Sequence, residues 1–238
     1  MRQSNSYIII YSAVLTIVCG GLLALAAEGL KDKQQANIEL EQKKNILSTV
    51  MELKEGDNIE EIYNKRVKAF VIDFQGNVKE GMLAKDVAVA SEYKKPREER
   101  LLPIYEFRSD SGKIEFVSLP VYGYGLWNNI WGYVALTADL NTIQGVKFQH
   151  AGETPGLGAR IESDGTVQGR YKGKKVFENG EVVSVVMQKG EGKDYSNDAH
   201  SVDGMSGATL TGKGVNNMLK DYFACYKNYL TKNQTASN

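Results

Sequence analysis

The chain has 238 residues, with 29 basic and 29 acidic side chains, so its formal net charge at pH 7 is zero. This balance argues against a nucleic-acid-binding protein, which normally carries an excess of Lys and Arg. Apolar residues make up 42% of the chain, which is enough for the core of one sizeable domain or two small ones.

The first predicted element is a membrane anchor within residues 1–30. Residues 7–27 are apolar and uncharged, and this length of roughly 21 residues matches one membrane-spanning helix. A cleaved signal peptide is the alternative, but its apolar core would be shorter and more positive charge would precede it. Arg2 precedes the run and two lysines follow it, so the flanking charges leave its orientation open. Because no ionisable residue interrupts the run, we expect a tether and not an ion path.

A charged helix is predicted to follow the anchor. Within residues 31–53, Ile46, Leu47, Val50 and Met51 recur at helical spacing. Gly56 and Asp57 are expected to end this helix. We therefore predict a linker helix over residues 31–57 that carries a soluble domain, residues 58–238, away from the membrane.

The soluble part has the pattern of an α+β domain with an antiparallel or mixed sheet and flanking helices. Short runs of β-branched and aromatic residues, separated by turn residues, predict its strands. These runs are residues 67–74, 104–108, 114–119, 131–138, 143–150 and 182–187. A hairpin is expected around Ser109–Gly112. Residues 78–93 show no clear period, and the charge run 94–100 is expected to be a solvated loop without functional weight.

Two glycine-containing segments in the second half are candidates for chemistry. Residues 123–127, Gly-Tyr-Gly-Leu-Trp, either cap the core or cover a flat cofactor. Residues 150–158 include Thr154 and Pro155, a helix cap followed by a proline suited to the first helical position. That capping role is compatible with ligand binding by the same segment.

The third candidate is the stretch 203–214, which holds several glycines and the hydroxyls of Ser206, Thr209 and Thr211. An amphipathic helix is predicted directly afterwards, with Val215, Met218, Leu219, Tyr222, Phe223, Tyr226 and Leu230 on one face. Glycines permit close approach of a ligand, and a helix N-terminus favours an anion such as phosphate. The alternative is a purely structural turn before a helix.

The sequence gives little support for a P-loop, a hydrolase active site, a disulfide or a metal site. The chain lacks a P-loop motif, and Ser206 has no nucleophile-elbow context, so a hydrolase is disfavoured. Cys19 and Cys225 have no obvious partner, and His150 and His200 are too few for a zinc site. We predict neither a disulfide nor a metal site.

Asp203-Gly204-Met205-Ser206-Gly207-Ala208-Thr209 resembles the flavinylation motif of FMN-binding domains, in which the final threonine carries FMN through a phosphoester. Residues 150–158 and 123–127 resemble two further signatures of the same domains. Together with the single anchor, they make nearly the whole chain similar to the NqrC family, which belongs to the sodium-translocating NADH:quinone reductases. The RnfG family of the Rnf ferredoxin complex is a related alternative, which the segment 42–47 resembles less.

The resemblance implies a set of flavin-site residues. Thr209 is the implied FMN acceptor, although residue chemistry alone does not separate it from Thr211. Asp203 is implied to be recognised by a flavin transferase that moves FMN from FAD. The remaining implied cofactor contacts are Ser206, Gly207, Ala208, Leu210, Thr211, Glu153, Thr154, Leu157, Gly158, Leu126 and Trp127. No catalytic residue is implied, because the flavin supplies the redox chemistry and the protein supplies position and electrostatics.

By the same resemblance, the chain transfers electrons in a complex that couples quinone reduction by NADH to Na⁺ export. Its implied partners are NqrA, NqrB, NqrD, NqrE and NqrF, and its domain faces the periplasmic side of a bacterial inner membrane. A stand-alone membrane-anchored FMN module and an anchored domain without flavin remain open. One departure from the family pattern is Arg160, where an acidic residue is expected. The polar segment 163–175 also predicts that any helix there is short or absent.

Overall fold

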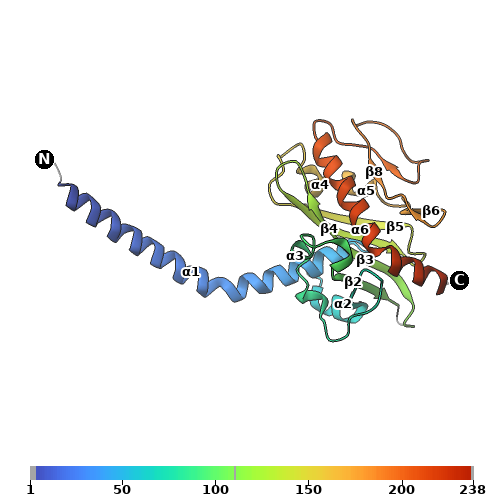
Figure 1. Ribbon diagram of the computed structural model, residues 1–238, viewed down its shortest axis with the longest axis horizontal. Helices are drawn as coiled ribbons and strands as arrows, with labels where there is room; N and C mark the ends of the chain where they lie inside the picture. Colours follow the sequence, from blue (N-terminus) through green and yellow to red (C-terminus); the bar gives the residue numbers. More distant parts are fainter. Residues whose placement is uncertain (1–3, 110, 237–238) are drawn as a thin grey trace. The chain divides into compact units, whose positions relative to one another are not determined.

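The computed structural model describes residues 4–109 and 111–236, with the side chains of residues 235 and 236 left out. It divides into two units, residues 1–42 and 43–238 (Figure 1). The first unit consists of most of helix α1, and the second is a compact α+β unit. The α+β fold predicted from the sequence is confirmed.

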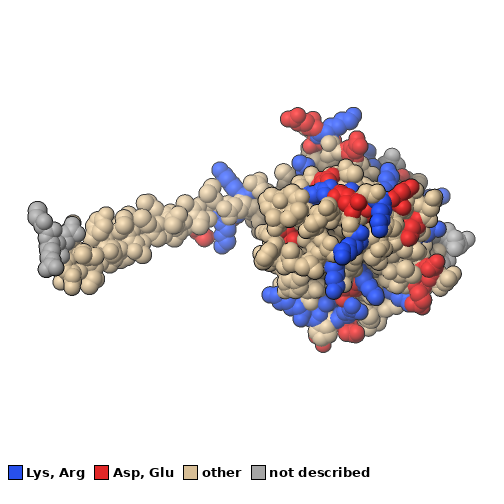
Figure 2. Space-filling view, turned by 90° about the horizontal axis from the view of Figure 1, so that it is seen from above, with Lys and Arg blue, Asp and Glu red and all other residues tan. Residues whose placement is uncertain are grey.

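Helix α1 (Asn5–Ser48) is one continuous element across the predicted anchor and linker. Its apolar part has a mean hydropathy of 2.5, none of it is buried, and it is long enough to cross a membrane. Charged side chains appear only toward the later part of the helix (Figure 2). The expectation that Gly56 and Asp57 end this helix is wrong. The helix already ends at Ser48, where the Thr49 hydroxyl donates to the Ile46 carbonyl at 2.6 Å and satisfies a terminal acceptor.

The core of the second unit is a five-stranded antiparallel sheet in the order β1-β2-β3-β4-β5. Its strands are β1 (Val67–Ile72), β2 (Leu102–Arg108), β3 (Ile114–Tyr124), β4 (Asn129–Thr137) and β5 (Ile143–His150). Each strand pairs with its sequence neighbour. Short connections join β2 to β5 in succession, whereas the long connection between β1 and β2, residues 73–101, contains three short helices. Five of the six predicted strands are confirmed in type, and β3 runs past its expected end to Tyr124.

Both faces of this sheet are covered. Helix α6 (Thr209–Ala236) packs on one face with its apolar side, where Leu219, Phe223 and Tyr226 are buried with Leu119. The other face is covered by the end of α1 with α2 (Ile59–Arg66) and η1 (Ala84–Asp86). Figure 1 shows α6 crossing the strands, so its N-terminus reaches the end of the sheet where β3 turns into β4.

The remaining elements are short. They are α3 (Val89–Glu92), η2 (Arg97–Glu99), α4 (Arg160–Ser163), α5 (Gly165–Gly169), β6 (Phe177–Glu178), β7 (Glu181–Val182), β8 (Val186–Met187) and β9 (Ser201–Val202). The single strand expected over residues 182–187 is wrong. Ser184 has a φ of 70°, which breaks the extended backbone between β7 and β8. The helix expected after Gly158 is indeed short, since it is reduced to α4 and α5.

The charge run 94–100 is not a solvated loop throughout. Arg100 is buried, and its guanidinium donates to the Asp221 carboxylate of α6 at 2.6 Å. The same guanidinium lies over the rings of Tyr93 and Tyr222, at 5.1 and 5.7 Å from their centroids. A planar guanidinium can pair with a carboxylate and stack on aromatic rings at the same time, which accounts for the burial of this arginine. The mixed charges of residues 94–100 gave no sign of this contact.

Candidate functional site

Residues 203–208, which we call the acceptor turn, lead directly into the N-terminus of the 28-residue helix α6. Thr209 is the first helical residue, and both Thr209 and Ser206 are exposed. Gly207 has a φ of 72°, which glycine adopts readily, and an added Cβ there would lie 2.8 Å from Leu157 Cδ2. An exposed hydroxyl at the start of a long helix suits a phosphoryl group, because unpaired backbone N–H groups and the positive end of the helix dipole lie beside it.

The structure separates the two threonines that the sequence left equivalent. Thr211 is 1% exposed, and its hydroxyl donates to Glu153 Oε2 at 2.5 Å. Thr209 lies two residues earlier on the exposed side of the same turn. Of these two threonines, Thr209 is therefore the one whose hydroxyl is accessible to a reagent from solvent.

Glu153 connects three segments of the site. Its buried carboxylate accepts hydrogen bonds from the backbone N–H groups of Leu126 at 2.9 Å and Trp127 at 3.0 Å, in addition to Thr211. Burial alone would raise the pKa of Glu153, but the hydrogen bonds from Thr211 and from the backbone outweigh burial and lower the pKa. The ionised carboxylate thus joins the β3–β4 loop to the first turn of α6.

Close backbone packing surrounds this carboxylate. A Cβ on Gly125 would collide with Glu153 Oε1, and one on Gly158 would lie 2.5 Å from Glu153 Oε2. A Cβ on Gly214 would collide with the Tyr124 carbonyl and lie 3.0 Å from Gly125 Cα. The three predicted glycine-containing segments are therefore brought together, and the packing leaves no room for a side chain at Gly125, Gly158 or Gly214.

An exposed apolar surface lies on the same three segments. Its large side chains are Tyr124, Leu126, Trp127, Leu157 and Leu210, each between 41% and 69% exposed. The Trp127 indole N–H donates to the Thr154 hydroxyl at 3.2 Å, which orients the ring. Exposed apolar side chains gathered around a polar attachment point are typical of a binding surface. Of the two interpretations of residues 123–127, a cofactor cover fits Leu126 and Trp127, whereas Gly123 packs against Met218 in the core.

A group of charged residues beside the acceptor turn escaped the sequence reasoning. The Glu191 carboxylate accepts from Arg160 at 2.7 and 2.9 Å, from Arg170 at 3.0 Å and from the Ser206 backbone N–H at 2.9 Å. Hydrogen bonds from Arg160 above all lower the pKa of Glu191. Arg160, unexpected from the family pattern, also pairs with Asp164 at 2.9 Å. The only local signal was Glu191 between Gly190 and Gly192, which marks a turn.

Asp203 has its carboxylate engaged within the protein. It accepts from the Gly192 N–H at 2.8 Å and from the Lys193 N–H at 3.2 Å. The loop that contains Glu191 is therefore held against the acceptor turn at two positions, Asp203 and Ser206.

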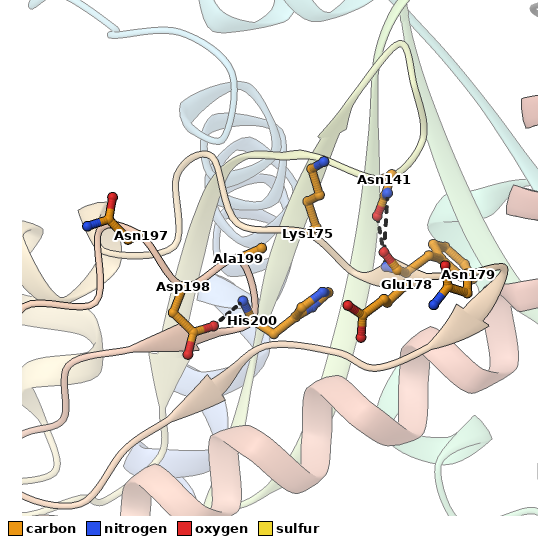
Figure 3. Close-up of a pocket in the computed structure, with 9 residues that line it drawn as sticks. Asn141, Lys175, Glu178, Asn179, Asn197, Asp198, Ala199 and His200 are labelled. Carbon is orange, nitrogen blue, oxygen red and sulfur yellow. Dashed lines mark hydrogen bonds between the residues drawn. The ribbon is translucent and has the colours of Figure 1, made fainter.

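A cavity of about 720 Å³ lies elsewhere, between β6 and the 197–200 segment (Figure 3). Asn141, Lys175, Glu178 and His200 are among its lining residues. The His200 backbone N–H donates to Asp198 and the Asn141 side chain bonds the backbone of Phe177, so these groups hold the loops together. None of the predicted flavin-site residues lines this cavity.

Comparison with known proteins points to one family. The model of the FMN-binding domain matches residues 125–224. The C subunit of the Na(+)-translocating NADH-quinone reductase from Haemophilus ducreyi is 32% identical, over 93% of this chain and 91% of the relative. The counterpart from Pseudomonas aeruginosa is also 32% identical, over 98% of each chain.

Solved structures agree with the sequence relatives. The crystal structure of the same reductase component from Parabacteroides distasonis superposes with a TM-score of 0.74 at 33% identity, covering 85% of this chain and 97% of that one. The crystal structure of Shewanella oneidensis NqrC gives 0.72 at 29% identity, covering 82% and 97%. The similarity therefore extends across the fold and includes all three segments of the site.

Proposed function

The chain belongs to the NqrC family of Na⁺-translocating NADH-quinone reductases, as an FMN-dependent electron-transfer subunit of that oxidoreductase, and we propose that a phosphoester to Thr209 holds its FMN. The observation that carries this proposal is the contrast between the two threonines. Thr209 is exposed at the start of α6, while Thr211 is buried with its hydroxyl bonded to Glu153. A bond to phosphate needs an accessible hydroxyl, which Thr209 offers.

The residues around Thr209 suit the two parts of FMN. The first backbone N–H groups of α6, with Ser206, Gly207 and Ala208 before them, would hold the phosphate. Leu126, Trp127, Leu157 and Leu210 offer exposed apolar surface for the planar ring, with Thr154 orienting Trp127. Glu153 and Gly158 lie behind this surface and support it. When bound, the flavin supplies one-electron redox chemistry, and the chain supplies its position.

We further propose how the chain is placed in its complex. Residues 1–30 anchor it in a bacterial inner membrane, α1 continues as a link to residue 42, and the compact unit that begins at Lys43 forms the periplasmic flavin domain. The apolar part of α1 and the family name support an anchor in a membrane complex. NqrA, NqrB, NqrD, NqrE and NqrF are the proposed partners, and a flavin transferase that uses FAD and recognises Asp203 is the proposed maturation enzyme.

Covalent attachment has a direct test. The full chain is co-expressed with an active flavin transferase and run on a denaturing gel under ultraviolet light. We expect a fluorescent band for the wild type and for Thr211→Ala, and no band for Thr209→Ala. Circular dichroism shows whether each variant is folded. A folded Thr209→Ala protein that still fluoresces would place the bond elsewhere, and a dark wild-type band would exclude covalent flavin.

A further inference from the structure

A second cavity, of about 400 Å³, borders the start of the flavinylation motif at Asp203, and none of the exposed apolar residues of the site lines it. The cavity is lined by residues of the segment 170–174 after α5, by the segment 193–196, by Val202 at the end of β9 and by Asp203. Arg170 Nη1 donates to the Asp203 carbonyl at 3.2 Å and to the Gly204 carbonyl at 2.5 Å. The cavity is therefore attached to the start of the flavinylation motif, and none of the proposed FMN contacts lines it.

Four cationic side chains line this cavity: Arg170, Lys172, Lys174 and Lys193. Lys174 is only 7% exposed, and its ammonium donates to the carbonyls of Tyr195 at 2.5 Å and Asp198 at 2.7 Å. Within residues 4–109 and 111–236, none of the three lysines forms an ion pair with a carboxylate. The Lys174 ammonium is bonded to two carbonyls and interacts electrostatically with the carboxylates of Asp194 and Asp198. An anion in the cavity would offset the remaining cost of burying its charge.

The two aspartates of the lining are already engaged. Asp203 accepts from the Gly192 and Lys193 backbone N–H groups, and Asp194 accepts from the Ser196 N–H at 2.8 Å. Arg170 is paired with Glu191. When the Arg170–Glu191 pair is left out, the lining contains three lysines and two aspartates, so its net charge is positive.

We propose that this cavity is a binding subsite for a phosphate group. Phosphate offers several charged acceptor oxygens, which can bond the ammonium groups of Lys172, Lys174 and Lys193 together, whereas a carboxylate offers only two oxygens. A volume of about 400 Å³ exceeds one inorganic phosphate and lies in the usual range of about 300–1,000 Å³ for small-molecule sites. The ring of Tyr195 in the same lining suits a phosphate ester that carries a planar group.

The proposal is tested by calorimetric titration of the detergent-solubilised full chain in a phosphate-free buffer. Inorganic phosphate and AMP are the two probes, and we expect saturable binding in the millimolar range or tighter. Chains prepared with and without the co-expressed flavin transferase should bind these probes with the same affinity, so the result does not depend on flavin attachment. AMP bound about tenfold more tightly than phosphate identifies an ester with a planar group, and equal affinity identifies phosphate alone.

The variants that test the subsite replace Lys172 and Lys193, because both are exposed. Lys174 is buried, and its replacement could prevent folding. Lys172→Gln and Lys193→Gln should each weaken phosphate binding by about tenfold, since each removes one charge-assisted hydrogen bond. Lys175→Gln is the matched control, because Lys175 is exposed and lines the other cavity (Figure 3). Absence of saturation at about 10 mM phosphate or AMP, or equal weakening by Lys175→Gln, would overturn the proposal.

Discussion

At the scale of single residues, Glu153 holds the β3–β4 loop and the first turn of α6 together at the candidate site. One buried carboxylate accepts the Thr211 hydroxyl at 2.5 Å and two backbone N–H groups of the β3–β4 loop. The sequence resemblance implied that Glu153 contacts the flavin. The structure places its oxygens against protein donors, so we infer that Glu153 positions the surface on which the flavin rests.

This role predicts a pH-dependent stability. The folded-state pKa of Glu153 is lowered from 4.5, so its contribution is present above the unfolded value and is lost as the pH falls through the folded value. Glu153→Gln, which turns an acceptor oxygen into a donor, should lower the free energy of unfolding by about 1–3 kcal/mol at pH 7. Denaturant unfolding of both proteins from pH 7 downward should show this difference shrinking below about pH 4.5.

The exposed carboxylate of Glu178 provides the control for that experiment. Glu178→Gln should change the free energy of unfolding by less than about 0.5 kcal/mol at every pH. If the difference between wild type and Glu153→Gln stayed constant from pH 7 to pH 3, Glu153 would not be ionised against these donors in the folded state.

The sequence indicated which residue types form the site but not their individual roles. Thr209 and Thr211 are two positions apart in one turn, and only the buried partner Glu153, 58 residues from Thr211, distinguishes them. Likewise, Arg160 departed from the family pattern, and its pairing with Glu191 was not visible because the two residues are 31 positions apart. Local patterns report on neighbours in sequence, and these choices depend on neighbours in space.

At the scale of elements, Gly214 fixes how closely α6 approaches the β3–β4 loop. Alanine normally stabilises a helix interior by about 1 kcal/mol relative to glycine. At Gly214 the added Cβ would meet the Tyr124 carbonyl and Gly125 Cα, which are backbone atoms that cannot rotate away. We therefore expect Gly214→Ala to lower the free energy of unfolding by about 1–3 kcal/mol.

The control for Gly214 is the last residue of α5. A Cβ on Gly169 would have no heavy atom within 4 Å. Gly169→Ala should leave the free energy of unfolding unchanged or raise it by up to about 1 kcal/mol. Equal effects of the two substitutions in denaturant unfolding would show that α6 does not depend on contact with the loop.

The pair Arg100–Asp221 joins the η2 segment to α6. Breaking a buried pair by removing one partner costs about 3–5 kcal/mol, because the other charge remains buried. The Arg100 side chain is 8% exposed and that of Asp221 is 16% exposed, so we expect Arg100→Met to lower the free energy of unfolding by about 2–4 kcal/mol.

Arg97 bonds the same carboxylate from a half-exposed position, with 48% of its side chain exposed. Arg97→Gln should therefore cost less than about 1 kcal/mol in the same unfolding measurement. A larger cost for Arg97→Gln than for Arg100→Met would mean that burial does not set the strength of this contact.

Elements with a strong local period were predicted well, and those set by distant partners were not. The five sheet strands follow from runs of β-branched and aromatic residues, and α6 follows from helical spacing. The start of α6 was predicted too late, because the helix begins at Thr209, within the glycine-containing stretch 203–214. The break at Ser184 between β7 and β8 and the burial of Arg100 carry no local signal. Arg100 contacts Asp221 across 121 positions, and a run of mixed charges has the same sequence pattern whether one of its arginines is buried or none is.

At the scale of the whole molecule, the sequence predicted boundaries at residues 30 and 57, between an anchor, a linker and a domain. In the structure, one helix runs unbroken from Asn5 to Ser48, across the first of these boundaries. The compact unit begins at Lys43, inside that helix. Ile46 and Leu47 are 2% and 0% exposed, packed with Val71 and Phe107 on the sheet. The end of α1 therefore belongs to the folded domain, and the domain boundary is a point within a helix.

Two truncated chains test this boundary. A chain that begins at Lys43 should unfold cooperatively in denaturant and should not co-sediment with lipid vesicles, whereas the full chain is expected to do so. A chain that begins at Val50 loses Ile46 and Leu47, so its free energy of unfolding should be lower by at least about 4 kcal/mol, because each buried aliphatic side chain contributes about 2–5 kcal/mol. Leu47→Ala in the Lys43 chain should produce about half of that loss. Equal stability of the two truncated chains would assign the end of α1 to the linker and return the boundary to residue 57.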